Sequence, residues 1–157
     1  MAKVELVPQV AKPPQGTVVF LIGMRINKWW QVHRWLPAFF AMVPMLSELH
    51  KNKERFGFLD AKTWVGRTVM TVQYWRSLDE LLAYARNASA EHHPAWKRFN
   101  RVVGNNGAVG IYHEAYVLRP AEIHTVYRNM PPFGLGRATS AVPQRPLAYT
   151  PEMDLAS

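Results

Sequence analysis

The residues with the clearest capacity for chemistry lie in the stretch 109–117, where His113 and Glu114 stand side by side in an apolar and aromatic run. β-branched and aromatic residues dominate this stretch, which predicts a buried strand. Because side chains alternate along a strand, His113 shares its face with Ile111 and Ala115. An imidazole among apolar neighbours is either a satisfied core histidine or a group that works as an acid or base.

The opposite face of this strand carries Glu114 between Tyr112 and Tyr116. A direct relay from Glu114 to His113 within one strand is therefore not expected. No charged residue on its own face explains the presence of His113, and the small Ala115 leaves space beside the ring. We predict that His113 lines a ligand cavity.

The composition limits the class of protein. The chain has 157 residues, of which 48% are hydrophobic and 19% are charged, and this is typical of one globular domain. It contains no cysteine, which excludes a disulfide framework, a thiolate metal site and a cysteine nucleophile. We expect a cytoplasmic protein without a signal peptide or a membrane span, since the longest apolar run, residues 35–46, is too short.

The formal net charge of +8 raises the question of a nucleic-acid partner. The positive residues are scattered and form no dense run. The segment from Arg55 to Phe58 resembles the start of an RNA-recognition strand, but the following residues do not continue that pattern. We therefore predict a generally basic surface and no nucleic-acid partner.

The elements that must position His113 follow from hydrophobic periodicity. Residues 17–26 predict a central strand, and residues 28–51 predict a helix that Pro37 and Pro44 kink or divide, leaving room for a ligand. The other expected elements are a hairpin of strands at 56–64 and 67–76, a helix to residue 86 opened by a Ser77–Glu80 capping box, a helix opened by His92-His93-Pro94, and the strand of His113.

The order strand, helix, strand, strand, helix, strand is that of a ferredoxin-like split βαβ unit, an α+β fold. A single sheet covered by helices on one face must bury its other face. We therefore predict a homodimer in which two sheets pair into a dimeric α/β barrel. The expected domain spans residues 17–136, after an arm at 1–16 and before an irregular tail at 137–157.

Five short blocks, in order along the chain, carry a resemblance to a known family. They are Gly23-Met24-Arg25-Ile26-Asn27, Tyr74-Trp75-Arg76-Ser77, His93-Pro94-Ala95-Trp96, His113-Glu114 and Tyr127-Arg128-Asn129-Met130-Pro131. On these blocks the chain resembles the dimeric α/β-barrel proteins of the antibiotic-biosynthesis-monooxygenase type. Within them it is similar to a small monooxygenase-like family that includes fungal polyketide-pathway oxygenases.

The resemblance implies a monooxygenase-like enzyme that needs no cofactor and acts on a substrate able to form a stabilised carbanion. His113 is the candidate base, and a phenol from Tyr74, Tyr112 or Tyr116 is the candidate donor to the developing oxyanion. Glu114 would orient a neighbouring group. We assign a small hydrophobic, polycyclic or polyketide-like substrate to an aromatic pocket lined by Trp35, Phe39, Phe40, Trp75, Trp96 and Tyr112.

The second half of the chain also resembles the haem-dependent aldoxime dehydratases, in which a helix histidine binds the haem iron and a strand histidine serves acid–base chemistry. His113 matches the second role. Trp96 cannot ligate iron, so His92 or His93 would have to hold the haem. The alternatives to the monooxygenase are therefore a haem-binding protein, either a dehydratase or a simple haem binder, and a non-catalytic carrier of hydrophobic ligands.

Overall fold

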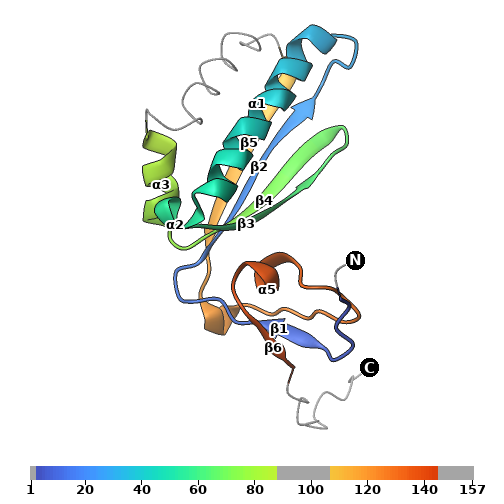
Figure 1. The fold of residues 1–157 in the computed structure, drawn as a ribbon. Coiled ribbons are helices and arrows are strands. Elements are labelled where there is room, and N and C mark those ends of the chain that lie inside the picture. The colour runs from blue at the N-terminus through green and yellow to red at the C-terminus, as the bar shows by residue number, and fades with distance from the viewer. Residues whose placement is uncertain (1–2, 88–106, 145–157) are drawn as a thin grey trace, which may run out of the picture.

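The centre of the protein is a four-stranded antiparallel sheet in the order β3-β4-β2-β5 (Figure 1). This computed structural model describes residues 3–87 and 107–144. The strands are β2 (Val18–Ile26), β3 (Phe58–Trp64), β4 (Thr68–Trp75) and β5 (Val109–Val117). With a helix between β2 and β3 and another after β4, this order confirms the predicted ferredoxin-like α+β fold.

The central strand is β2, as its apolar sequence predicts. It pairs with β4 on one side and with β5 on the other. In this register Ile22 lies between Thr71 of β4 and His113 of β5. Residues that are neighbours across a sheet point to the same face, so these side chains form one row.

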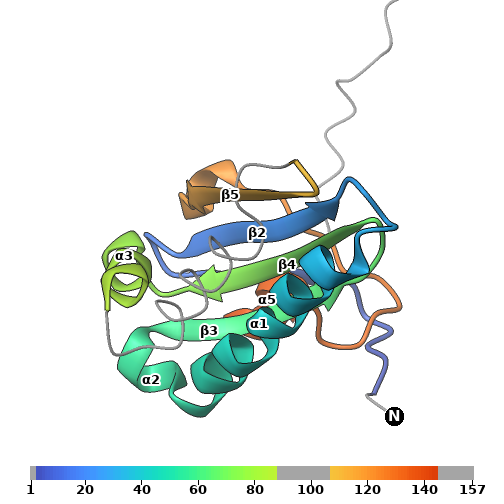
Figure 2. The same ribbon diagram turned by 90° about the horizontal axis from the view of Figure 1, so that it is seen from above.

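Three helices lie on one face of the sheet: α1 (Val32–Lys51), α2 (Lys53–Phe56) and α3 (Leu78–Arg86) (Figure 2). The helix α3 begins at the predicted capping box, in which the Glu80 backbone N–H donates to the Ser77 hydroxyl at 3.2 Å. The two faces of the sheet are therefore distinct, and we call this one the helix-covered face.

The helix-covered face holds two separate clusters of buried residues. The first joins all three helices to one end of the sheet, around Phe58 and Trp75. The second lies toward the other end, around Met24 and Ile26, beneath the first half of α1. On β2, Phe20 and Ile22 lie between the two clusters and are only half-buried.

The side chains between the two clusters come from three adjacent strands. By register and alternation they point to the helix-covered face. We call this set the central strip; its members are Phe20, Ile22, Thr71, Gln73 and His113.

The helix α1 runs without interruption from Val32 to Lys51. The prediction was that Pro37 and Pro44 kink or divide this helix, and of these two alternatives the division does not occur. Packing of an apolar stripe against a sheet supplies most of the stability of such a helix, and it outweighs the loss of two backbone hydrogen bonds. Pro44 is exposed, so the carbonyl group that its ring leaves unpaired can be hydrated.

The other face of the sheet carries no long helix in the described part of the chain, and we call it the open face. The short helix α5 (Gly134–Ala138) packs against β3 at one end of it. Arg137 of α5 makes a bidentate ion pair with Asp60, with Nε–Oδ2 and Nη2–Oδ1 distances of 2.6 and 2.7 Å. The side chain of Asp60 is only 8% exposed, so this pair anchors α5 to the sheet.

The two terminal segments pair with each other. The strand β1 (Gln9–Ala11) runs antiparallel to β6 (Ala141–Pro143), and Gln9 also bridges to Tyr127. The prediction of an irregular tail is therefore wrong for residues 137–144, and residues 145–157 lie outside the described residues. These pairings join positions far apart in the sequence, so local periodicity carries no signal for them. The boundaries of the predicted domain remain a prediction.

The Asp60–Arg137 pair leads to a first prediction. Replacing Asp60 with Asn keeps the shape of the side chain but leaves Arg137 with a neutral acceptor and one mismatched N–H···NH₂ contact. Loss of a charged hydrogen bond at a buried oxygen should lower the free energy of unfolding by about 1–3 kcal/mol. Urea unfolding followed by circular dichroism measures this change.

The matched control is Glu122→Gln, which breaks the Arg119–Glu122 pair, whose side chains are 69% and 66% exposed. An exposed ion pair contributes little, so the control should unfold like the wild type. Equal stability of the Asp60 and Glu122 variants would show that the Arg137 contact does not anchor α5.

Candidate functional site

His113 lies on β5, which is an edge strand of the sheet and pairs only with β2. Most of β5 is exposed, including His113, so the prediction of a buried strand is wrong. The physical reason is topological: β5 is an edge strand, and of its residues only Val109 at its start belongs to the buried cluster beneath α1. The residue composition of a strand cannot report whether it lies at the centre or the edge of a sheet.

The imidazole of His113 belongs to the central strip of the helix-covered face. Its ring centroid lies 6.0 Å from that of Phe20, with the two planes tilted by 47°. Among the described residues, nothing forms a hydrogen bond with the His113 ring. The imidazole ring therefore lies beside the apolar side chains of Phe20 and Ile22, and both of its nitrogens are available to a ligand.

Tyr74 lies on the open face, on the other side of the sheet from His113. Alternation along β4 requires this, because the buried Trp75 next to it packs against the helices. Burial raises the pKa of the Tyr74 phenol above its usual value, and the nearby Tyr127 and Asp60 raise this pKa further. The sheet thus separates the predicted base from the predicted oxyanion donor, and the two cannot act on the same atom.

Glu114 also lies on the open face, where it accepts a hydrogen bond of 2.6 Å from the Tyr116 hydroxyl. This hydrogen bond raises the pKa of the Tyr116 phenol, and the negative charge of Glu114 raises it further. Both residues are exposed. Their contact agrees with the expectation that Glu114 does not relay protons to His113.

The residues assigned to an aromatic substrate pocket do not come together in one pocket in the described part of the chain. Trp75 is fully buried in the core between the rings of Phe58 and Tyr84, which differs from the expectation that it touches a substrate. Trp35 and Phe39 pack beside the second core cluster.

Phe40 and Tyr112 do not belong to that cluster, although the Phe40 ring contacts that of Phe39 at 5.5 Å. Phe40 on α1 is 58% exposed. Tyr112 lies on the open face above Gly23, where a Cβ atom would come within 2.7 Å of the Tyr112 ring. Trp96 and the two candidate haem ligands, His92 and His93, lie outside the described residues.

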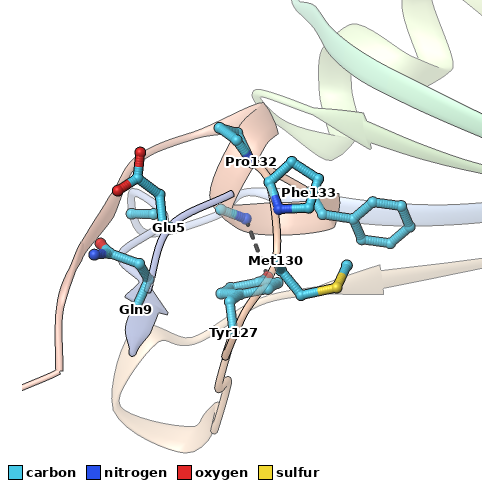
Figure 3. A pocket seen from close by; sticks show the side chains of 9 residues that line it. Glu5, Gln9, Tyr127, Met130, Pro132 and Phe133 are labelled. Atoms are coloured by element: carbon cyan, nitrogen blue, oxygen red, sulfur yellow. Dashed lines mark hydrogen bonds between the residues drawn. The ribbon is translucent and has the colours of Figure 1, made fainter. Parts of the chain in front are cut away.

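A groove of about 300 Å³ lies between the N-terminal arm and the segment from Tyr127 to Gly136 (Figure 3). Glu5 and Gln9 line one side, and the Tyr127 hydroxyl accepts a hydrogen bond of 3.1 Å from the Gly136 N–H. None of the predicted site residues lines this groove. Its walls are two chain segments joined by backbone hydrogen bonds, such as that from the Glu5 N–H to the Met130 carbonyl.

Sequence reasoning missed Gln73, which is a buried amide of the central strip and is 2% exposed. The signal was present, because Gln73 follows Val69 and Thr71 on one face of a strand whose next member is Trp75. A glutamine in the middle of an apolar face needs a partner, as a histidine does.

No described helix is long and apolar enough to cross a bilayer. The described residues also contain no group of three or more His, Asp or Glu side chains placed to hold a metal ion. The central strip carries the imidazole of His113 and the carboxamide of Gln73 on the same face of the sheet.

The sheet order and the helices on one face define a ferredoxin-like α+β protein. The chain belongs to the monooxygenase af470-like family, whose model matches residues 17–135. A comparison with curated proteins finds no match. Membership of this family assigns the protein a general monooxygenase-like function.

Solved structures resemble this chain at low sequence identity. An aldoxime dehydratase in complex with butyraldoxime superposes with a TM-score of 0.64 and 17% identity, over 88% of this chain and 45% of the dehydratase. The chain thus spans less than half the length of that enzyme. SnoaB, a cofactor-independent oxygenase from Streptomyces nogalater, matches with a TM-score of 0.48 and 9% identity, over 66% of this chain and 94% of SnoaB.

The contact between Glu114 and Tyr116 leads to a second prediction. The Glu114→Gln variant keeps a hydrogen-bond acceptor but removes the negative charge that opposes formation of the phenolate. The pKa of Tyr116 should therefore fall toward its ordinary value, and one tyrosine should ionise at lower pH than in the wild type. Ultraviolet titration of the phenolate band measures this shift, and Glu122→Gln serves as the control without an effect. An unchanged titration curve in the Glu114 variant would contradict the contact.

Proposed function

We propose that the protein is a monooxygenase that oxidises a small hydrophobic substrate on the central strip, with His113 as the acid–base group. The observation that carries the proposal is the position of His113. It stands on the helix-covered face between two core clusters, beside the ring of Phe20, with no hydrogen-bond partner among the described residues. Because the imidazole is both exposed and without a partner among the described residues, a ligand can reach its two ring nitrogens.

The proposed substrate carries an acidic CH₂ group between aromatic rings that are conjugated to a carbonyl group. His113 accepts one proton from this carbon, and the resulting carbanion is stabilised as an enolate. The anion supplies the electrons that reduce O₂. One oxygen atom becomes a new carbonyl on the substrate and the other leaves as water, so that RCH₂R′ and O₂ give RC(=O)R′ and H₂O.

The apolar side chains beside His113 suit this chemistry. Phe20 and Ile22 offer a surface on which flat aromatic rings pack, and they keep water from the side of the anion that faces the sheet. Phe39 and Trp35 extend the apolar surface along α1. In this scheme the electrons come from the substrate, so the chain does not have to hold a redox cofactor.

Haem remains the alternative cofactor predicted from the sequence. Its candidate ligands, His92 and His93, lie outside the described residues, so the proposed reaction is not routed through it. If haem is bound, His92 or His93 would hold it, and it would supply an iron centre for a substrate. The cytoplasmic location also remains a prediction.

The open face supports the predicted homodimer. Its central side chains, Val19, Leu21 and Val72, are apolar and only half-buried in the single chain. A second copy that packs its own open face on this surface would remove these side chains from water. The end of the face that α5 covers would lie outside this contact.

The proposed role of His113 leads to a third prediction. Anthrone is the probe, because its CH₂ group lies between two aryl rings and opposite a carbonyl group. The His113→Leu variant should oxidise anthrone at least about 100-fold more slowly, as expected for the loss of a general base. Its melting temperature should stay close to that of the wild type, since no hydrogen bond is broken. Oxygen uptake and thermal unfolding are measured on the same preparation.

His124→Leu is the matched control, because His124 is exposed and lies outside the central strip. A fully active but strongly destabilised His113 variant would overturn the catalytic role. Anthrone that binds without being oxidised would favour the carrier, and a haem absorption band in the purified protein would favour the haem alternative.

The predicted dimer leads to a fourth prediction. The wild type should be a dimer at micromolar concentration, and Leu21→Glu should convert it to a monomer because a carboxylate would be buried in the contact. Light scattering coupled to size exclusion measures both. Leu82→Glu places the same charge at an exposed position of α3 and should leave the dimer intact. A monodisperse wild-type monomer would contradict the pairing.

A further inference from the structure

We propose that Gln73 is a second functional residue of the central strip and donates a hydrogen bond from its amide nitrogen to the substrate oxygen that becomes negatively charged. This inference rests on the proposed function. Tyr74 was predicted to provide this donor, but it lies on the open face, away from His113. Gln73 would provide the donor on the helix-covered face. An anion formed in an apolar site needs such a donor.

The orientation of the Gln73 carboxamide is determined by its neighbour Trp75. The Trp75 indole Nε1–H donates to Gln73 Oε1 at 3.0 Å. An indole nitrogen only donates, so the atom that faces it must be the oxygen of the amide. Trp75 is itself 0% exposed and is held by ring contacts with Phe58 and Tyr84, so the anchor is rigid.

With the oxygen fixed in this way, the Gln73 Nε2 group presents two N–H donors. Among the described residues, no acceptor forms a hydrogen bond with them. In the described part of the chain, the buried side-chain N or O atom without a hydrogen-bond partner is Oε1 of Gln31, so Gln73 Nε2 keeps a small contact with solvent. A donor that a water molecule can reach is also open to a ligand that accepts from Nε2.

The placement of Gln73 relative to His113 matches the proposed reaction. Gln73 pairs with Phe20 on one side of β2, and His113 pairs with Ile22 on the other side. Two strand spacings and an offset of two residues along β2 separate their backbones by about 12 Å, and both side chains point to the same face. An aromatic substrate that lies on Phe20 and Ile22 therefore has the imidazole at one edge and the amide at the other.

This geometry suits a substrate in which the proton is lost at one side of a ring and the charge appears at the other. In anthrone the CH₂ carbon and the carbonyl oxygen lie at opposite positions of the central ring. The base takes the proton from the carbon, and the amide receives the enolate oxygen. The interaction is stronger in the anion than in the neutral ketone, as stabilisation of a transition state requires.

Gln73 could also have a purely structural role, in which it only accepts the hydrogen bond of the Trp75 indole. The Gln73→Glu variant distinguishes the structural role from the role as a donor, because it keeps the oxygen that accepts from Trp75 and replaces the NH₂ group with a second oxygen. With its carboxyl group ionised, the variant should oxidise anthrone at least about 100-fold more slowly than the wild type. Acidic pH protonates the carboxyl group and restores a donor, so activity relative to wild type should rise as the pH falls.

Gln15→Glu is the control, since it adds the same charge at an exposed position. Gln73→Met serves as the second variant if the glutamate disturbs folding, because it keeps the length of the side chain and removes all donors. Wild-type rates in both Gln73 variants, or a Gln73→Glu deficit that does not change with pH, would overturn the proposed role.

A measurement without turnover separates this inference from the proposed function. In anaerobic solution, anthrone is added to ¹⁵N-labelled protein while the His113 imidazole and the Gln73 side-chain NH₂ signals are followed. Shifts of both signals support the proposal. A shift at His113 alone would overturn the role of Gln73 and leave the proposed function intact. If neither signal shifts and the protein takes up no oxygen with anthrone, the proposed function is wrong. The proposed role of Gln73 is then wrong as well.

Discussion

The register of β2 with its two neighbours is the constraint on which the rest of the structure depends. Because β2 pairs with β4 and β5 at once, it decides which residues of those strands share a row. Strand alternation then decides which face each row occupies. An imidazole and a carboxamide come to lie on the helix-covered face, whereas the phenol of Tyr74 and the carboxylate of Glu114 lie on the open face.

The helix-covered face divides its buried core into two parts. Two clusters, one at each end of the sheet, bury Trp75 and Met24 almost completely, while Phe20 and Ile22 between them stay half-buried. Apolar area left in contact with water forgoes about 25 cal/mol per Å². Functional sites commonly carry such a cost, and the rigid clusters on both sides hold the residues between them in place.

The open face is closed at one end by a different kind of interaction. The charged contact between Asp60 and Arg137 fixes α5, and the pairing of β1 with β6 ties the N-terminal arm to the segment after α5. An ion pair with one buried partner stabilises the fold only when its geometry is good, and the two short distances meet that condition. The remaining apolar part of this face is the surface that a second copy would cover.

The sequence by itself determined the features that depend on neighbouring residues. The hairpin of β3 and β4, the Ser77 cap of α3 and the ferredoxin-like order follow from periodicity, turn residues and local hydrogen bonds, which act over a few positions. Alternation also predicted that His113 and Glu114 point to opposite faces, because it is a property of every strand.

Only the tertiary structure decided which face the helices cover and which strand lies at the edge. These depend on packing between residues far apart in the chain. For this reason the sequence did not reveal that β5 is exposed, that Trp75 is a core residue or that Tyr74 is separated from His113 by the sheet. The pairing of Trp75 with Gln73 became visible only once both side chains were placed on one buried face.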